Sequence, residues 1–343
     1  MKKTLSRNKI IIVMLLVSLA ILASLCFLTK QVMETPNYLD QEQIVELKPG
    51  ATIRSLTRQL EQLGLIDHPE LLILWSRLNG DAKRLQVGEY TVHPAMTLSQ
   101  LLSDITTGHV RQYPLQLLEG WTFKQFMQAI SDNEAIDHQL AGLDHKQILQ
   151  QLNISYDHPE GLFFPDTYYF HKNISDINIL KRAYTQMQSH LDNLWQQRDK
   201  ELPFESPYQA LIMASIVEKE SAVAEERTLI AGVFINRLRR NMRLQTDPTV
   251  IYGLGDSYDG DIRFRDLRND TPYNTYTRKG LPPTPIAMPG LGALKAVMHP
   301  EKSDYLYFVA INDNSGRHKF SSTLEEHNKA VDLYQRKRRK ITK

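Results

Sequence analysis

The chain opens with an uninterrupted run of apolar residues, from Ile10 to Leu28. This run reads IIIVMLLVSLAILASLCFL, carries no charge, and is broken only by Ser18 and Ser24. As a helix it would rise about 28 Å, close to the roughly 30 Å hydrocarbon core of a bilayer. A cleaved signal peptide usually has an apolar core of only about 7–15 residues, followed by a small-x-small site that is missing here. We therefore predict a transmembrane helix over residues 10–28, with a cleaved signal peptide as the alternative.

The residues on either side of this run predict its orientation. Residues 1–9 hold four basic residues and no acid, so the positive-inside rule leaves the N-terminus in the cytoplasm and exports the rest. The only cysteine, Cys26, lies inside the run, which excludes a disulfide framework in the exported part. Residues 29–42 are polar and lack periodicity, and we predict a linker there.

Regular apolar spacing begins directly after this linker and predicts a small unit of strands and helices. Three sites are typical helix starts: Thr52, Asp67 with Glu70 three positions later, and Thr97 with Gln100. The predicted order is strand, helix, helix, strand and helix, over residues 44–47, 52–63, 67–79, 85–92 and 97–108.

This strand–helix–helix–strand order resembles a LysM-like module, a small fold associated with binding N-acetylated glycan chains. The spacing between its two helices is longer than usual, and the sequence assigns no sugar contacts. We predict a LysM-like subdomain over residues 43–110.

The following region, residues 111–335, mixes strands and helices without a regular alternation of the two. A stretch at 255–290 is rich in Gly, Pro, Asn and Asp, and long irregular segments inside a compact domain are often functional. This mixture predicts an α+β fold for the larger domain. The expected strands are 112–118 and 305–310, and the expected helices are 180–199, two within 206–240, 291–298 and 324–336.

Composition narrows the class of protein only after the charges are divided along the chain. Apolar residues make up 42 % and charged residues 23 % of the 343 positions, an ordinary globular mix. The net charge of +2 hides a basic N-terminal segment and a basic tail at 336–343, and between them residues 31–335 hold 30 basic and 39 acidic residues. An exported body at −9 disfavours nucleic acid as a partner.

Motifs for several other chemistries are missing from the sequence. It has no HExxH, GxSxG, Walker loop or GxGxxG, and its eleven histidines lack metal-ligand spacing. We expect no metal and no cofactor.

The most informative window is an apolar helix predicted to start at Ser206, where Pro207 and Gln209 complete a typical N-terminal signal. Glu218 falls on a face of this helix otherwise lined by small residues, whereas Glu220 points to the opposite, apolar side. A buried carboxylate is costly unless it is paired. Two explanations stay open: a structural ion pair with an arginine, or a desolvated acid with a raised pKa that donates a proton. The nearby arginines are Arg237, Arg239 and Arg243.

A set of short motifs carries a family resemblance. They are 160–161 (EG), 164–168 (FPDTY), 215–220 (SIVEKE), 233–238 (VFINRL), 244–253 (LQTDPTVIYG), 272–276 (PYNTY), 280–286 (GLPPTPI), 318–321 (HKFS) and 326–328 (EHN). With these motifs in this order, the chain resembles the MltG (YceG-like) family of endolytic murein transglycosylases over essentially its whole length.

The resemblance implies an inner-membrane enzyme with a periplasmic catalytic domain, which cuts nascent peptidoglycan strands between N-acetylmuramic acid and N-acetylglucosamine. The family's catalytic glutamate matches Glu218. This single carboxyl would protonate the glycosidic oxygen and then take the proton of the muramyl C6 hydroxyl as that oxygen attacks C1, giving a 1,6-anhydro ring. Peptidoglycan synthases acting on the same strands are candidate partners. The expected substrate-positioning residues are Gln245, Asp247, Tyr273, Asn274 and Tyr276.

Two other functions stay open at this point. A muramidase would hydrolyse the same bond, with Asp247 or Glu225 as the second carboxylate. A non-catalytic envelope adaptor would only hold glycan through the LysM-like part. Reducing ends that carry one more water would indicate the muramidase, and a Glu218→Gln variant that keeps its function in cells would indicate the adaptor.

Overall fold

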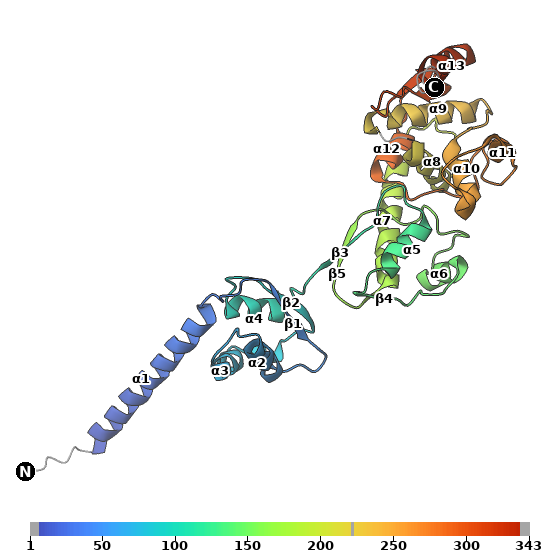
Figure 1. Ribbon diagram of the computed structural model, residues 1–343. Helices are drawn as coiled ribbons and strands as arrows, with labels where there is room; N and C mark the ends of the chain where they lie inside the picture. The colour runs from blue at the N-terminus through green and yellow to red at the C-terminus, as the bar shows by residue number, and fades with distance from the viewer. Residues whose placement is uncertain (1–6, 221–222, 337–343) are drawn as a thin grey trace, which may run out of the picture. The chain divides into compact units, whose positions relative to one another are not determined.

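The computed structural model describes residues 7–220 and 223–336, which form two compact units (Figure 1). The first unit holds the chain up to Tyr113 together with Tyr169–Lys172, and the second holds Pro114–Tyr168 and the chain from Asn173 on. Our sequence prediction placed a single boundary between residues 110 and 111 and did not include this return to the first unit. The predicted cytoplasmic segment 1–9 and basic tail 336–343 lie largely outside the described residues.

Helix α1 (Arg7–Glu34) contains the predicted membrane span. In the described part of the chain it is the one helix long and apolar enough to cross a bilayer, and the apolar side chains of the span are exposed. Its last turns differ, because Thr29 and Met33 are buried where α1 contacts α3 (Pro69–Leu78) and α4 (Leu98–Thr107). The helix therefore continues through residues that we had assigned to a linker, and its end belongs to the core of the first unit.

The first unit has the predicted strand–helix–helix–strand order, followed by α4. Strands β1 and β2 pair antiparallel, from Gln43 opposite Val92 to Leu47 opposite Gly88. The elements before α4 are β1 (Gln43–Leu47), α2 (Ile53–Gln62), α3, the 3-10 turn η1 (Asp81–Lys83) and β2 (Gly88–Val92).

Local capping explains where these helices begin. The hydroxyls of Thr52 and Thr97 each accept the backbone N–H of the third helical residue, whose side chain returns the bond, so these two helix starts are confirmed. The capping box expected at Asp67 is wrong. Helix α3 instead has His68 as its N-cap, without a side-chain bond, and Pro69 supplies the fixed φ that suits the first helical position.

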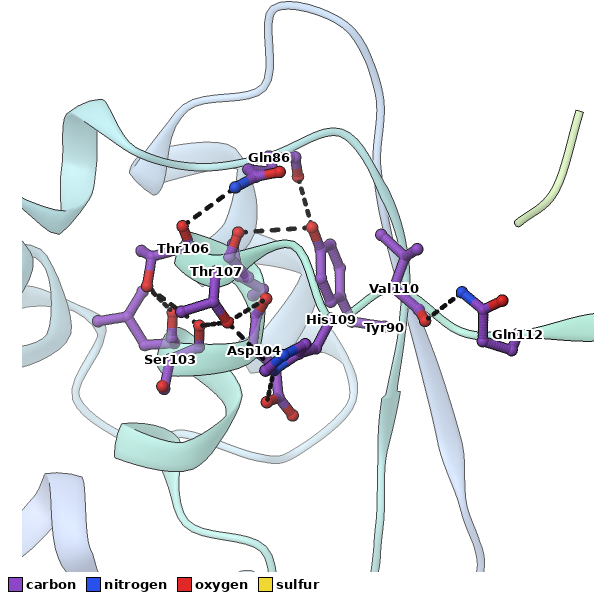
Figure 2. A network of polar contacts seen from close by, with 11 residues as sticks. Gln86, Tyr90, Ser103, Asp104, Thr106, Thr107, His109, Val110 and Gln112 are labelled. Carbon is purple, nitrogen blue, oxygen red and sulfur yellow. Dashed lines mark hydrogen bonds and ion pairs between the residues drawn. The ribbon is translucent and has the colours of Figure 1, made fainter. Parts of the chain in front are cut away.

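A polar network closes the end of α4 onto β2 (Figure 2). The hydroxyl of the fully buried Tyr90 donates to the Gln86 carbonyl at 2.9 Å, and the Gln86 side chain donates to the Thr106 carbonyl at 3.2 Å. Gly108 ends the helix with a φ of +79°, and a Cβ there would lie 2.4 Å from the Gln86 Oε1 atom. The positive φ therefore favours glycine at this position, and a larger residue would also push the Gln86 side chain aside.

Two paired strands, β3 (Tyr113–Gln116) and β5 (Thr167–Phe170), carry the chain between the units. At their first-unit end, Lys172 Nζ lies 2.5 Å from Glu89 Oε1, and the Tyr113 hydroxyl donates to the other oxygen of the same carboxylate. Since Glu89 lies on β2 and is only 8 % exposed, these bonds fasten both crossings to the first unit.

The second unit is built around helix α8 (Pro207–Glu220), whose residues 210–217 are all buried. The predicted start is confirmed, because Ser206 Oγ accepts the N–H of Gln209 at 3.3 Å. The Gln209 side chain in turn accepts the N–H of Glu205 at 3.0 Å. Around α8 pack α7 (Asp176–Gln197), α9 (Arg227–Arg239), α10 (Asp247–Leu254) and α12 (Leu291–Met298).

Shorter elements complete the second unit and confirm a mixed α+β content. The predicted irregular stretch holds only η3 (Gly255–Ser257) and α11 (Phe264–Arg268). The others are α5 (Phe123–Ser131), β4 (Ile136–Asp137), α6 (His145–Leu152), β6 (Ile174–Ser175), η2 (Ala224–Glu226), β7 (Tyr307–Ala310), β8 (His318–Ser321), α13 (Leu324–Val331) and the π-helix η4 (Asp332–Arg336).

Candidate active site

Glu218 lies near the C-terminal end of α8, and its side chain is only 6 % exposed. One carboxylate oxygen accepts the backbone N–H of Gly290 at 2.9 Å, and the other lies 3.3 Å from Nη2 of Arg227. Burial raises the pKa of this carboxyl above its usual value, because the desolvation outweighs the hydrogen bond from Gly290 and the charge of Arg227. The structure thus contains the buried acid that the sequence predicted. Its carboxylate is bound by Gly290 at the start of α12 and by Arg227 of α9.

The arginine beside Glu218 is not one of the three that we had considered. Arg227, the first residue of α9, lies between two acids, because its Nη2 atom is also 3.9 Å from Glu119 Oε2. The Glu119 side chain is 47 % exposed and the Arg227 side chain 18 %, so this trio reaches from the interior to solvent. Arg227 is the first basic residue after Glu220, which is the only sequence signal that could have indicated it.

Two glycines make this arrangement possible. A Cβ on Gly290 would lie 1.8 Å from the Glu119 carboxylate, and a Cβ on Gly292 would lie 2.3 Å from Arg227 Nη1. Both glycines belong to the start of α12, which packs directly against α8. Any larger residue at these positions would displace the acid or the arginine.

Arg237, which we had considered as a partner of Glu218, has a different role. It is 8 % exposed, and its guanidinium donates to the carbonyls of Leu306 at 2.6 Å and Leu244 at 2.8 Å. It also donates to the carbonyl of Arg243 and to Gln245 Oε1. This buried arginine therefore fixes the segment that leads into α10, including one of the predicted substrate residues.

The predicted substrate-positioning residues lie in two segments that the structure brings together. The backbone N–H of Gln245 donates to the Thr275 carbonyl at 3.2 Å, and the Tyr276 hydroxyl donates to Asp247 Oδ1 at 2.5 Å. Between Gln245 and Asp247, the Thr246 hydroxyl donates to Glu220, two residues beyond the catalytic candidate on α8. Gln245 and Asp247 are exposed and Tyr276 is half-buried, so all three stay candidates for contact with a ligand.

Asn274 and Tyr273 have mainly internal contacts. The Asn274 side chain is 1 % exposed, donates to three carbonyls at the end of α11, and accepts the N–H of Tyr276 at 2.8 Å. The Tyr273 hydroxyl is paired with the Thr284 hydroxyl at 2.9 Å, and its ring packs edge-on against Tyr252 at 4.8 Å. These contacts let Asn274 shape the segment around Tyr276, while its predicted direct contact with substrate stays a prediction.

A second buried acid, Glu160, was missed as a site residue although it belongs to one of the motifs above. It is 2 % exposed, and its two oxygens accept the N–H of Phe123 at 2.9 Å and the hydroxyl of Tyr252 at 3.0 Å. Burial raises the pKa of this carboxyl to about 7 despite these hydrogen bonds. Glu160 therefore ties the first residue of α5 to α10 and carries a proton through mildly acidic pH.

The raised pKa of Glu160 predicts that the free energy of unfolding depends on pH. In the unfolded chain Glu160 titrates near its ordinary pKa of 4.5, whereas in the folded protein it titrates near 7. Between these values the folded state holds more protons, so the free energy of unfolding is expected to fall as pH rises, by about 3 kcal/mol in all. Urea unfolding of Glu160→Gln between pH 4.5 and 7.5 should lack this fall. If the free energy of unfolding changed with pH in the same way for Glu160→Gln and the wild type, this prediction would be contradicted.

A buried acid on an apolar helix, beside an arginine and a second acid, is the candidate acid–base site of this mixed α+β protein. The chain belongs to the YceG-like family, whose model matches residues 45–333. It is 32 % identical to an endolytic murein transglycosylase of Bacillus subtilis over 308 residues, covering 84 % of each chain. A relative with the same name from Streptococcus pneumoniae is 28 % identical, and the match covers 57 % of that longer protein.

A solved structure shows the same fold. The crystal structure of a YceG-like protein from Listeria monocytogenes is similar with a TM-score of 0.52 and 33 % identity. The match covers 84 % of this chain and 99 % of that one.

Proposed function

We propose that this protein is a membrane-anchored lytic transglycosylase that cleaves peptidoglycan strands internally, between N-acetylmuramic acid and N-acetylglucosamine. The names of the relatives support the reaction and the substrate class. The observation that carries the proposal is the burial of Glu218 between Gly290 and Arg227. Burial raises the pKa of this carboxyl, which suits a group that must arrive at the reaction with a proton.

Glu218 performs both proton transfers in this proposal. Its protonated carboxyl gives the proton to the glycosidic oxygen as the bond to C1 breaks. The resulting carboxylate takes the proton of the muramyl C6 hydroxyl while that oxygen bonds to C1, so the acid is regenerated and a 1,6-anhydro ring forms without water. Between these steps the carboxylate is stabilised by the N–H of Gly290 and the guanidinium of Arg227.

Substrate is positioned by the exposed side chains beside α10. Gln245 and Asp247 supply hydrogen bonds, while Tyr276 and the partly exposed Tyr273 offer ring faces to sugars. We assign Asn274 to the substrate-positioning residues because its side chain accepts the backbone N–H of Tyr276 and so orients that residue. The first unit, with its strand–helix–helix–strand order, would bind the glycan elsewhere as a LysM-like module.

The location proposed for this reaction follows from α1. We infer that α1 is kept as an inner-membrane anchor with its N-terminus in the cytoplasm, so that both units lie in the periplasm. The burial of Thr29 and Met33 supports retention, because a segment that is removed has no need to extend into the core of the unit that remains. Peptidoglycan synthases, which make the strands at this membrane, are the proposed partners.

Product masses test the reaction directly. Purified glycan strands treated with the full-length protein in detergent are expected to give muramyl ends in the 1,6-anhydro form, identified by mass spectrometry. Ends that carry one additional water would overturn the transglycosylase proposal and favour the hydrolytic muramidase. Strands of unchanged length would point to the non-catalytic adaptor.

A further inference from the structure

Glu119 is the acid that sequence reasoning did not connect with Glu218. It follows β3 and precedes α5, far from α8 in the sequence, yet it shares Arg227 with Glu218. The Nη2 atom of Arg227 is 3.3 Å from Glu218 Oε1 and 3.9 Å from Glu119 Oε2. The guanidinium thus lies between a buried and a half-exposed carboxyl, closer to the buried one.

The hydrogen bonds of the guanidinium do not tie it to one orientation between the two acids. Its Nε atom is buried and has no hydrogen-bond partner among the described residues, so no bond at that atom fixes its orientation. Gly292 lets Nη1 take its present position, because a Cβ there would lie 2.3 Å from that atom. Gly290 does the same beside Glu119, because any Cβ there would overlap the carboxylate.

Few other charges face Glu218 from the elements packed against it. On α8 itself the neighbouring Lys219 is exposed and donates to the Gly120 carbonyl at 3.2 Å. The start of α12 contributes the backbone N–H of Gly290. The charge balance at Glu218 therefore depends mainly on Arg227 and Glu119, with a smaller part from Lys219.

We propose that Glu119 is a positioning residue for Glu218. Glu119 attracts the Arg227 guanidinium and so weakens its ion pair with Glu218, and Glu218 therefore meets the substrate in its protonated form. This inference rests on the function proposed above, in which Glu218 is first a general acid. When Glu218 has released its proton, Arg227 moves fully onto the new carboxylate, and Glu119 stays in contact with solvent. Glu119 and Arg227 together thus favour protonated Glu218 before bond cleavage and ionised Glu218 after it.

The test is the pH dependence of strand cleavage by the full-length protein in detergent. A general acid must be protonated, so the rate falls as pH rises through its pKa. In Glu119→Gln the like charge is lost and Arg227 turns to Glu218 alone, so this falling limb should move to lower pH by about one unit. In Arg227→Gln the limb should move to higher pH, with a lower maximal rate because the carboxylate intermediate loses its cation.

Glu301→Gln is the matched control, because Glu301 is an exposed acid of the same unit outside this trio, and its profile should equal that of the wild type. Thermal melts of each variant confirm folding. A Glu119→Gln profile that coincides with the control would overturn the proposal, as would a shift to higher pH. Failure of the proposed function is separate: it would appear as cleavage by Glu218→Gln, whatever the Glu119 variant does.

Discussion

Replacing Glu218 with glutamine is expected to lower the rate of strand cleavage by about a thousandfold or more, without unfolding the protein. Glutamine has nearly the same shape and can still accept the N–H of Gly290, so α12 should stay on α8. It cannot donate a proton to the glycosidic oxygen or take one from the C6 hydroxyl. The loss should therefore appear in the maximal rate rather than in glycan binding.

Two measurements make this result decisive. Far-UV circular dichroism and the melting temperature of Glu218→Gln should match those of the wild type, and digestion of purified strands reports the rate. Glu225→Gln tests one of the two muramidase candidates, because a muramidase that used this exposed acid as its second carboxylate would lose activity with it. Full activity of Glu218→Gln in cells would instead leave the adaptor as the remaining explanation.

Replacing Arg237 with alanine is expected to lower the free energy of unfolding by about 3–5 kcal/mol. The guanidinium is bonded to three backbone carbonyls and to Gln245 Oε1, and it lies over the ring of Tyr307 at 5.1 Å. Truncation would leave the buried carbonyls of Leu306 and Leu244 without this donor and open a cavity. The segment entering α10 should also loosen, so cleavage is expected to weaken along with stability.

Arg239 offers a matched control on the same helix. Its side chain is exposed and, among the described residues, donates to the carbonyl of Glu201 at 2.8 Å. Arg239→Ala should cost less than about 1 kcal/mol in urea unfolding. If the two variants unfold at the same urea concentration, the buried hydrogen bonds of Arg237 do not stabilise the fold.

The elements that the sequence predicted well are those whose signals are local. Thr52 and Thr97 were recognised as helix caps because a cap depends on residues within one turn. Helix α8 was recognised from Ser206 and Pro207 and from the apolar residues on all its sides. Its apolar surroundings also drew attention to Glu218, because a carboxylate on such a helix is costly unless it is paired or has a function. The role of Glu218 in cleavage is still a prediction.

The surroundings of Glu218 could not be predicted, because they depend on distant segments. Gly290 reaches the site through the packing of α12 on α8, and Glu119 through backbone hydrogen bonds of Gly120 and Trp121 to Met288. Neither residue is marked by charge periodicity or by a motif we recognised. We considered Arg237, Arg239 and Arg243 and passed over Arg227, although it lies nearer to Glu218 in the sequence and the start of α9 brings it to this carboxylate. The box at Asp67 failed because Pro69 sets the helix start on its own.

The paired strands β3 and β5 determine how this molecule could be divided. Because the chain leaves the first unit at Tyr113 and returns to it at Tyr169–Lys172, the unit is not a cassette that one cut can remove. A fragment beginning at residue 111 would carry Phe170, which is 2 % exposed, and Lys172 without its carboxylate partner. Exchange of modules between relatives, by recombination or in the laboratory, would have to replace both crossings at once.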